Sequence, residues 1–164
     1  MINLSDYKRI HCIGIGGIGL SAIAEILMSR GYEVSGSDMR ESDMTEKLMR
    51  DGADIYLGHR AKNVEGKDLV VYSSAVGADN PELVRAAELG IPAVTRAQAL
   101  GALMDEYDNS IAISGTHGKT TTTSMVSLIL KNAEKKPTIL VGGNLSEING
   151  NVYVGGSDYF VTEA

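Results

Sequence analysis

The run Gly14-Ile15-Gly16-Gly17-Ile18-Gly19 decides the fold of the first part of the chain, because it joins a predicted strand to a predicted helix. The strand spans Lys8–Ile13 and the helix spans Ile18–Arg30, with apolar residues near helical period. In such a loop the first glycine permits a tight turn, the second lets a diphosphate approach the backbone, and the third lets helix and strand pack closely. This order is typical of a site for a dinucleotide or a diphosphate.

Strands and helices continue to alternate up to about residue 107. Apolar runs and the positions of glycine and proline predict strands at Glu33–Ser37, Asp54–Leu57, Leu69–Tyr72 and Ile91–Thr95, and helices at Asp43–Asp51, Pro81–Leu89 and Ala97–Glu106. Such an order specifies a parallel sheet wrapped by helices. We therefore predict an α/β chain whose residues 1–107 form a Rossmann-like, doubly wound parallel-sheet domain.

A second glycine-rich loop reads Ser114-Gly115-Thr116-His117-Gly118-Lys119-Thr120-Thr121-Thr122-Thr123 and lies between an apolar strand and a helix. Small residues let backbone N–H groups turn toward phosphates, the lysine neutralises β and γ oxygens, and the first threonine can reach Mg²⁺. The usual P-loop pattern fails at Ile113, but the tighter Gly-Thr-x-Gly-Lys-Thr spacing is present. We predict an ATP phosphate site with Lys119 as the catalytic residue, formed by Gly115, Thr116, His117, Gly118, Lys119, Thr120 and Thr121. His117 is open to two roles, a substrate contact or a hydrogen bond that stabilises the loop.

The polar segment Tyr107-Asp108-Asn109 marks a domain boundary, so residues 108–164 are predicted to begin a P-loop ATPase α/β domain. Within it we expect strands at Ile111–Gly115, Thr138–Val141 and Tyr159–Thr162, a helix at Lys119–Asn132, and a loop at Gly142–Asn151. Roughly 55 residues are too few to bury a good core alone. We therefore expect this second domain to be truncated and the chain alone to be catalytically inactive.

Composition limits the possible partners. The chain has 164 residues, 43% of them hydrophobic, a formal charge of -6, and one cysteine, Cys12, within the first predicted strand. The negative charge argues against nucleic acid as a partner, and Cys12 is expected to be a buried, inert thiol. No stretch approaches the roughly 20 apolar residues of a membrane span, and no signal peptide is evident. These features predict a cytoplasmic protein that binds no membrane; they do not predict its oligomeric state.

Four motifs together resemble the Mur ligases: the two glycine-rich loops, Ser35-Gly36-Ser37-Asp38, and Tyr72-Ser73-Ser74-Ala75-Val76. The Gly-Thr-x-Gly-Lys-Thr loop is shared by Mur ligases and folylpolyglutamate synthetases. The first glycine loop and His117 resemble most the branch of the family that adds L-alanine to UDP-N-acetylmuramic acid for peptidoglycan synthesis. The resemblance covers the whole chain and implies the first domain and the opening third of the second in a three-domain enzyme.

The resemblance also implies a reaction and further site residues. ATP would phosphorylate the lactyl carboxylate of UDP-N-acetylmuramic acid, and the amine of L-alanine would then displace phosphate from this acyl phosphate. The implied UDP-sugar site comprises Gly14, Gly16, Gly17, Ile18, Gly19, Asp38, Ser73, Ser74 and Asn144. The implied Mg²⁺ ligands are Thr120 and Glu163.

Alternatives remain open for several of these residues and for the function. Asp38 could bind a ribose or cap the following helix; Ser73, Ser74 and Asn144 could be turn residues; Glu163 could simply face solvent. An NAD-dependent Rossmann oxidoreductase would explain the first loop but not the second. A non-catalytic nucleotide-binding module and a sibling Mur ligase that attaches a recycled peptide are further alternatives.

Overall fold

The computed structural model of the chain describes residues 2–163. It divides into two compact units that meet between Ala102 and Leu103, and each unit is described by itself. This division falls a few residues before the boundary predicted after residue 107. The assignment of a ligand to each domain stays a prediction.

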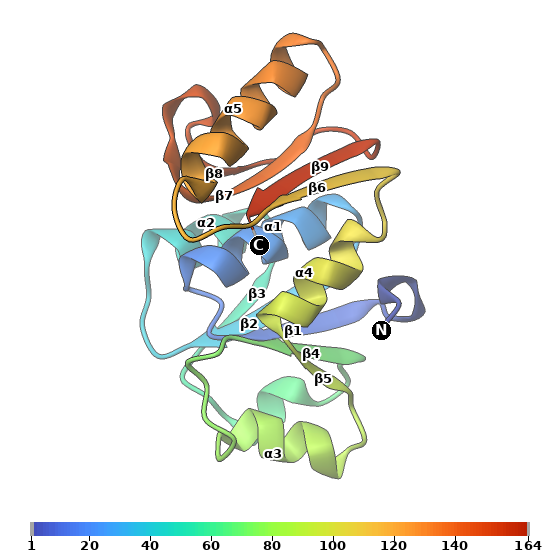
Figure 1. The fold of residues 1–164 in the computed structure, drawn as a ribbon. Helices are drawn as coiled ribbons and strands as arrows, with labels where there is room; N and C mark the ends of the chain where they lie inside the picture. Colours follow the sequence, from blue (N-terminus) through green and yellow to red (C-terminus); the bar gives the residue numbers. More distant parts are fainter. Residues whose placement is uncertain (1, 164) are drawn as a thin grey trace. The chain divides into compact units, whose positions relative to one another are not determined.

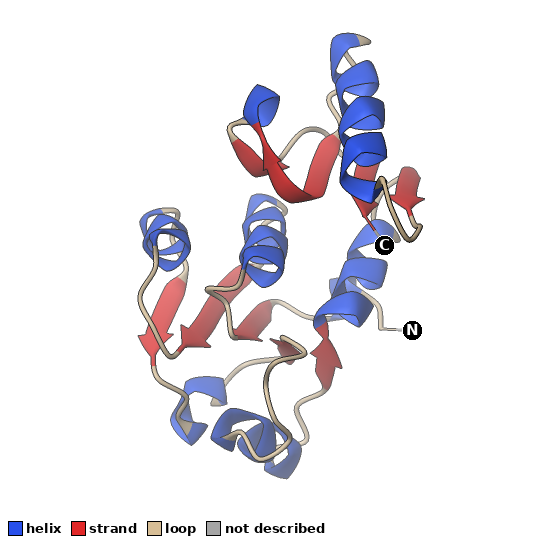
Figure 2. Ribbon diagram, turned by 60° about the vertical axis from the view of Figure 1, so that its left-hand side comes forward, coloured by secondary structure: helices blue, strands red, loops and turns tan. Residues whose placement is uncertain are grey.

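The first unit contains a parallel sheet of five strands in the order β3-β2-β1-β4-β5. The strands are β1 Arg9–Ile13, β2 Glu33–Asp38, β3 Asp54–Leu57, β4 Leu69–Tyr72 and β5 Ala93–Thr95. Helices α1 Ile18–Ser29, α2 Asp43–Arg50 and α4 Arg96–Met104 lie over one face, and α3 Pro81–Glu88 lies over the other (Figures 1 and 2). The predicted α/β class is confirmed, and most predicted ends differ by only one or two residues from those observed.

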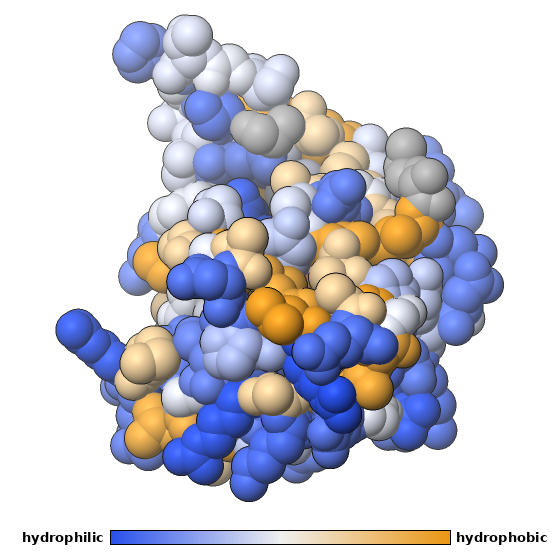
Figure 3. Space-filling view, turned by 90° about the horizontal axis from the view of Figure 1, so that it is seen from below, coloured by the Kyte–Doolittle hydropathy of each residue, from blue (hydrophilic) through white to orange (hydrophobic). Residues whose placement is uncertain are grey.

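The core of this unit explains why the strands read as continuous apolar runs. On the side of the sheet that α3 covers, Ile13, Val64, Val70 and Ala86 form a fully buried cluster. Cys12 is also fully buried, as predicted, and burial raises the pKa of its thiol to about 12, which makes it a poor nucleophile. The face of the molecule seen from below, the side on which α3 lies, is mostly hydrophilic (Figure 3).

Two short 3₁₀ helices, Leu4–Asp6 and Ala61–Val64, complete the first unit. Gly36 in β2 is required by the close approach of the first glycine loop. A Cβ atom at this position would lie 2.5 Å from Ile15 Cδ1 and 2.8 Å from the carbonyl oxygen of Cys12. The loop therefore packs directly on the second strand, and only glycine leaves room for it.

The second unit contains a sheet of four strands in the order β6-β9-β7-β8, with β6 Asn109–Ile113, β7 Thr138–Leu145, β8 Gly150–Tyr153 and β9 Tyr159–Glu163. Helix α5 spans Lys119–Asn132, as predicted, and packs against β6, β7 and β9. Tyr107 stacks on Phe160 with ring centroids 5.0 Å apart.

The loop predicted at residues 142–151 is wrong. Strand β7 continues to Leu145, and after the 3₁₀ turn Ser146–Ile148 the chain returns as β8, antiparallel to β7. Asn149 has a left-handed backbone, with φ of 54°, and Gly150 follows it. An Asn-Gly pair favours such a reversal because both residues tolerate positive φ, so the prediction overlooked an available hairpin signal.

Within the described residues, no helix is both long and apolar enough to cross a membrane.

Candidate functional site

A cleft of about 710 Å³ opens at the carboxyl ends of β1, β2 and β4, beside the first glycine loop. In open α/β sheets this edge is where ligands bind. Of the predicted site residues, Gly14, Gly16, Gly17, Asp38 and Ser73 line the cleft. Residues without a predicted role also line it, among them Arg40, Ser42, His59 and Asn80.

Of the other predicted residues of this group, Ile18, Gly19 and Ser74 are not among the residues that line the cleft, and Asn144 belongs to the second unit. Ile18 begins α1 and is 55% exposed. Gly19 faces Arg96, because a Cβ atom at Gly19 would lie 3.2 Å from the Arg96 side chain. Gly19 therefore leaves room for the first side chain of α4, and none of the nearest atoms belongs to a strand, as the predicted helix–strand packing would require.

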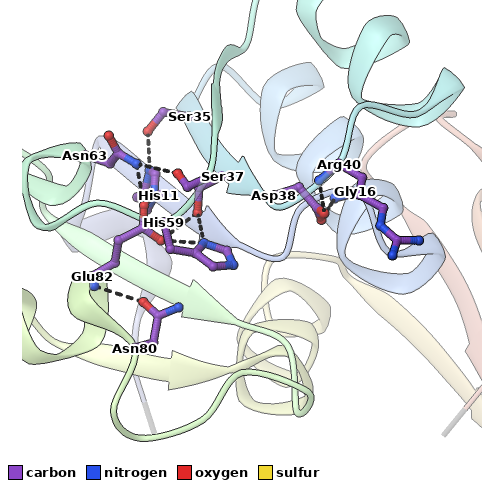
Figure 4. Close-up of polar contacts among 11 residues, drawn as sticks. His11, Gly16, Ser35, Ser37, Asp38, Arg40, His59, Asn63, Asn80 and Glu82 are labelled. Atoms are coloured by element: carbon purple, nitrogen blue, oxygen red, sulfur yellow. Dashed lines mark hydrogen bonds and ion pairs between the residues drawn. The ribbon is translucent and has the colours of Figure 1, made fainter.

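Asp38 stabilises the glycine loop. Its Oδ2 accepts a hydrogen bond of 2.9 Å from the backbone N–H of Gly16, and its Oδ1 accepts one of 3.2 Å from the N–H of Arg40 (Figure 4). The alternative that Asp38 caps the following helix is wrong, because Ser42 is the N-cap of α2 and forms a capping box with Thr45. Asp38 thus holds the loop in the shape that borders the cleft.

The helices that follow the two glycine loops differ from α2 and α3 in how their N-termini are capped. Helices α2 and α3 begin with the side-chain caps Ser42 and Asn80. Helices α1 and α5 begin after Gly17 and Gly118, and neither glycine can cap the helix with a side chain. The first N–H groups of an α-helix have no acceptor within the helix, and together with the helix dipole they favour an anion. Both loops therefore precede a helix N-terminus that has no side-chain cap, which is where a phosphate group is favoured.

A buried polar cluster lies behind the cleft and centres on Glu82, whose side chain is fully buried (Figure 4). Its Oε1 accepts a hydrogen bond of 2.6 Å from Asn63 Nδ2 and lies 3.5 Å from His11 Nε2. Its Oε2 accepts a hydrogen bond of 2.6 Å from Ser37 Oγ and lies 3.1 Å from His59 Nδ1. The sequence predicted none of these contacts.

The cluster keeps Glu82 ionised despite its burial. Burial by itself would raise the pKa of Glu82, but His11 close to Oε1 and the hydrogen bonds from Ser37 and Asn63 together outweigh burial and lower the pKa from 4.5 to about 2. A carboxylate that accepts several hydrogen bonds is stabilised in its charged form. At neutral pH Glu82 is therefore a buried anion that only accepts hydrogen bonds.

This lowered pKa predicts acid sensitivity. Since the folded pKa of Glu82 lies below the unfolded one, its contribution to the free energy of unfolding is present above about pH 4.5 and is lost as the pH falls toward 2. The contribution is about 3 kcal/mol at neutral pH by linkage. Urea unfolding between pH 6 and 2 should show this loss in the wild type and a smaller one in Glu82→Gln. Glu88→Gln, an exposed change on the same helix, should keep the wild-type slope; equal slopes for all three proteins would contradict this prediction.

In the second unit, the loop before α5 is exposed from Ser114 to Gly118. Gly118 has a left-handed backbone, with φ of 77°, which glycine adopts without strain. Lys119 Nζ donates a hydrogen bond of 2.7 Å to the carbonyl oxygen of Gly115. The ammonium group therefore lies over its own loop, within reach of a phosphate that the loop N–H groups would bind.

The two predicted Mg²⁺ ligands, Thr120 and Glu163, lie beside adjacent glycines of β7. Glu163 Oε1 accepts a hydrogen bond of 2.8 Å from the N–H of Gly142, and a Cβ atom at Gly143 would lie 3.5 Å from Thr120 Cγ2. A hydroxyl and a carboxylate are hard oxygen donors that suit Mg²⁺, which usually binds one or two carboxylates together with phosphates and water. Within residues 2–163 no cluster of three His, Cys, Asp or Glu side chains could hold a metal. These residues fit an ion held mainly by a nucleotide.

Asn144, which the resemblance placed at the UDP-sugar site, lies within strand β7. It is therefore a strand residue and not a turn residue, which was the alternative.

Comparison with protein families identifies the chain. A model described as Mur ligase family, catalytic domain, matches residues 9–108, which is more than half of the chain. The chain belongs to the Mur ligase family. The resemblance that the four motifs indicated is thus confirmed.

Curated relatives from this family match nearly the whole chain. One from Alkaliphilus metalliredigens is 57% identical over 157 residues, which cover 96% of this chain and 34% of the relative. One from Clostridium acetobutylicum is 59% identical with the same coverage. Both are named UDP-N-acetylmuramate–L-alanine ligase. The chain spans about a third of the length of these relatives.

Solved structures of Mur ligases have the same fold. The UDP-N-acetylmuramate-alanine ligase MurC of Thermotoga maritima is 40% identical with a TM-score of 0.85, over 94% of this chain and 36% of that one. The UDP-N-acetylmuramate:L-alanyl-gamma-D-glutamyl-meso-diaminopimelate ligase of Neisseria meningitidis is 30% identical with a TM-score of 0.85, over 96% of this chain and 52% of that one. The fold therefore does not separate these two kinds of Mur ligase.

Proposed function

We propose that this chain forms the UDP-sugar-binding part, and the start of the ATP-binding part, of an ATP-dependent ligase that joins L-alanine to the lactyl carboxylate of UDP-N-acetylmuramic acid. The observation that carries the proposal is the pair of glycine loops in a Mur ligase chain, each followed by a helix without a side-chain cap. One loop suits the diphosphate of the sugar nucleotide and the other suits the phosphates of ATP. The names of the relatives at 57% and 59% identity support L-alanine as the amine.

The proposed reaction has two steps. A carboxylate oxygen attacks the γ-phosphorus of ATP, so that ADP leaves and an acyl phosphate forms. The amine of L-alanine then attacks the acyl carbon, phosphate leaves, the amine loses a proton and an amide results. Phosphorylation is needed because an oxide ion is a poor leaving group. Enzymes accelerate such phosphoryl transfer mainly through positioning and charge neutralisation.

The residues of the chain divide these tasks between them. The N–H groups of Gly115–Thr121 bind the ATP phosphates, and Lys119 neutralises the charge that develops on the transferred group. Thr120 and Glu163 would hold Mg²⁺, which neutralises further phosphate charge. In the first unit, Gly14, Gly16 and Gly17 bind the UDP diphosphate and Ser73 offers a hydroxyl. These substrates occur in the cytoplasm, which is the proposed location.

A direct test joins residues 1–164 to the two thirds of the Alkaliphilus relative that this chain does not match; we call this the extended protein. It should release phosphate from ATP only when both UDP-N-acetylmuramic acid and L-alanine are present. The chain alone should release none. L-alanine-dependent phosphate release by the chain alone would contradict the assignment of this chain to binding only.

A sibling reaction, in which a recycled peptide replaces L-alanine, is compatible with the fold, because the Neisseria structure has the same TM-score as the alanine ligase. Because the first two domains bind the sugar nucleotide and ATP in either case, the chain itself is compatible with both. The higher identity to the alanine ligases favours L-alanine.

A further inference from the structure

We propose that Glu82 is a positioning residue that holds His59 with its proton on Nδ1, so that Nε2 faces the cleft as a hydrogen-bond acceptor for an N–H or O–H group of the ligand. The inference concerns the first-unit cleft and rests on the proposed function for the identity of that ligand. It assigns tasks to two residues for which the sequence predicted no role.

His59 belongs both to the cleft and to the buried cluster. Its side chain is 17% exposed and lines the cleft. Its Nδ1 lies 3.1 Å from Glu82 Oε2 and 2.9 Å from Ser37 Oγ. Figure 4 shows the ring attached to the cluster through this one nitrogen, with its other nitrogen directed away from Glu82. One edge of the ring is therefore held by the protein, and the other is left for the cleft.

The neighbours of His59 Nδ1 decide whether this nitrogen carries a proton. Glu82 is a buried anion and can only accept hydrogen bonds. Ser37 has a single hydroxyl proton, which it donates to Glu82 Oε2 at 2.6 Å, so its oxygen can only accept from His59. Both groups beside Nδ1 are therefore acceptors. Nδ1 must carry the proton, because an unprotonated Nδ1 would place its lone pair against a carboxylate.

Hydrogen bonds to both oxygens keep the Glu82 carboxylate from turning away from His59. Asn63 Nδ2 donates a hydrogen bond of 2.6 Å to Glu82 Oε1, and His11 Nε2 lies 3.5 Å from the same oxygen. The backbone N–H of Glu82 donates to the Asn80 side chain at 2.9 Å, which places the residue in the first turn of α3. His11 is turned toward Glu82 by a contact of 3.0 Å between its Nδ1 and Ser35 Oγ. Glu82 is thus fixed from both oxygens and from its backbone.

The tautomer of His59 decides whether its Nε2 accepts or donates a hydrogen bond in the cleft. A neutral imidazole with its proton on Nδ1 has a lone pair on Nε2 and accepts a hydrogen bond there. UDP-N-acetylmuramic acid offers suitable donors in the imide N–H of its base and in its hydroxyl groups. With the opposite tautomer, Nε2 would donate, and such a ligand donor would face another N–H. Glu82 therefore decides that this part of the cleft offers a hydrogen-bond acceptor, although Glu82 does not itself contact the ligand.

Two measurements on the chain test the inference. The first is the ¹⁵N spectrum of the histidine rings at neutral pH without ligand, which distinguishes a protonated from an unprotonated ring nitrogen. In the wild type, His59 should carry its proton on Nδ1. In Glu82→Gln, where the side-chain amide can donate, the Nε2-protonated form should increase. A wild-type proton on Nε2, or an unchanged tautomer in the variant, would overturn the inference.

The second measurement is calorimetric titration with UDP-N-acetylmuramic acid in a double-mutant cycle. We expect Glu82→Gln to weaken binding about fivefold to tenfold, the effect of one hydrogen bond, and His59→Ala to do at least as much. In the His59→Ala background, Glu82→Gln should have no further effect, because its influence passes through His59. His59→Gln, which can present an acceptor oxygen, should recover part of the affinity.

Controls separate positioning from folding. Glu88→Gln changes an exposed carboxylate on the same helix, paired with Arg85, and should leave both measurements unchanged. An equal loss of affinity from Glu82→Gln with and without His59 would make Glu82 purely structural and overturn the proposal. If the wild type does not bind the UDP sugar, the ligand contact falls together with the proposed function. The ring spectrum of the wild type still tests the predicted proton on Nδ1, and a proton on Nε2 would overturn the inference whether or not a variant folds.

Discussion

Replacement of Lys119 by alanine is expected to lower the turnover of the extended protein by at least about 100-fold, the usual cost of removing one group that stabilises transition-state charge. Lys119 is the first residue of α5, and its ammonium group lies 2.7 Å from the carbonyl oxygen of Gly115 over the phosphate loop. Lys119 is the one lysine or arginine between Ser114 and Thr123. ATP-dependent phosphate release at saturating substrates measures the effect.

A matched control exists on the same helix. Lys131 lies in the last turn of α5, where it donates to the carbonyl oxygen of Glu147 and lies over the ring of Tyr153. Lys131→Ala removes the same charge far from the loop along the helix and should keep turnover within about twofold. Similar losses from both substitutions would show that the effect is on the stability of α5 and not on phosphate transfer.

Replacement of Gly16 by alanine is expected to weaken binding of UDP-N-acetylmuramic acid at least about tenfold, or 1.4 kcal/mol. The added Cβ would lie 2.9 Å from Asp38 Oδ2, closer than real Cβ atoms approach without a shift, and 3.3 Å from Thr45 Cγ2, which is a tight contact. Because Gly16 N–H also donates to that carboxylate, the shift displaces the loop that borders the cleft. Overpacking of this kind also costs about 1–3 kcal/mol of stability. Calorimetric titration and thermal unfolding measure the two effects.

Gly101→Ala is the control for this substitution. Gly101 lies in α4, and a Cβ atom there would meet nothing within 4 Å. Alanine favours a helix over glycine, so stability should stay equal or rise slightly while affinity is unchanged. Wild-type affinity in Gly16→Ala would mean that the diphosphate does not bind at this loop.

Periodicity and glycine placement predicted most of the first unit, because each strand and helix there is a local pattern that the tertiary fold does not override. The same reasoning placed Gly14, Gly16, Asp38 and Ser73 at one edge of the sheet, where the structure brings them to one cleft. Carboxyl ends of parallel strands meet at that edge, so their order along the chain was enough.

The cluster around Glu82 could not be predicted in this way. Its members come from β1, β2, α3 and the segment after β3, and no spacing in the sequence links them. A glutamate directly after Pro81 is typical of the first turn of an exposed helix, where it faces the helix dipole. Only the packing of α3 on the sheet buries Glu82 and brings it to His11 and His59.

The prediction for the second unit failed at β8 for a different reason. The Gly142-Gly143 pair favours a loop, but β7 passes through it because the N–H of Gly142 bonds to Glu163 and the strand continues to Leu145. A side chain from the neighbouring strand decides the end of β7, whereas the turn before β8 has a local signal in Asn149-Gly150 that the prediction overlooked.

The central claim is that the first unit binds a UDP sugar at its glycine loop, and calorimetric titration of this chain with UDP-N-acetylmuramic acid tests it most directly, with NAD⁺ titrated in parallel. We predict binding of the UDP sugar that Gly16→Ala weakens, and no binding of NAD⁺. Binding of NAD⁺ without binding of the UDP sugar would contradict the account and assign the first unit to an oxidoreductase.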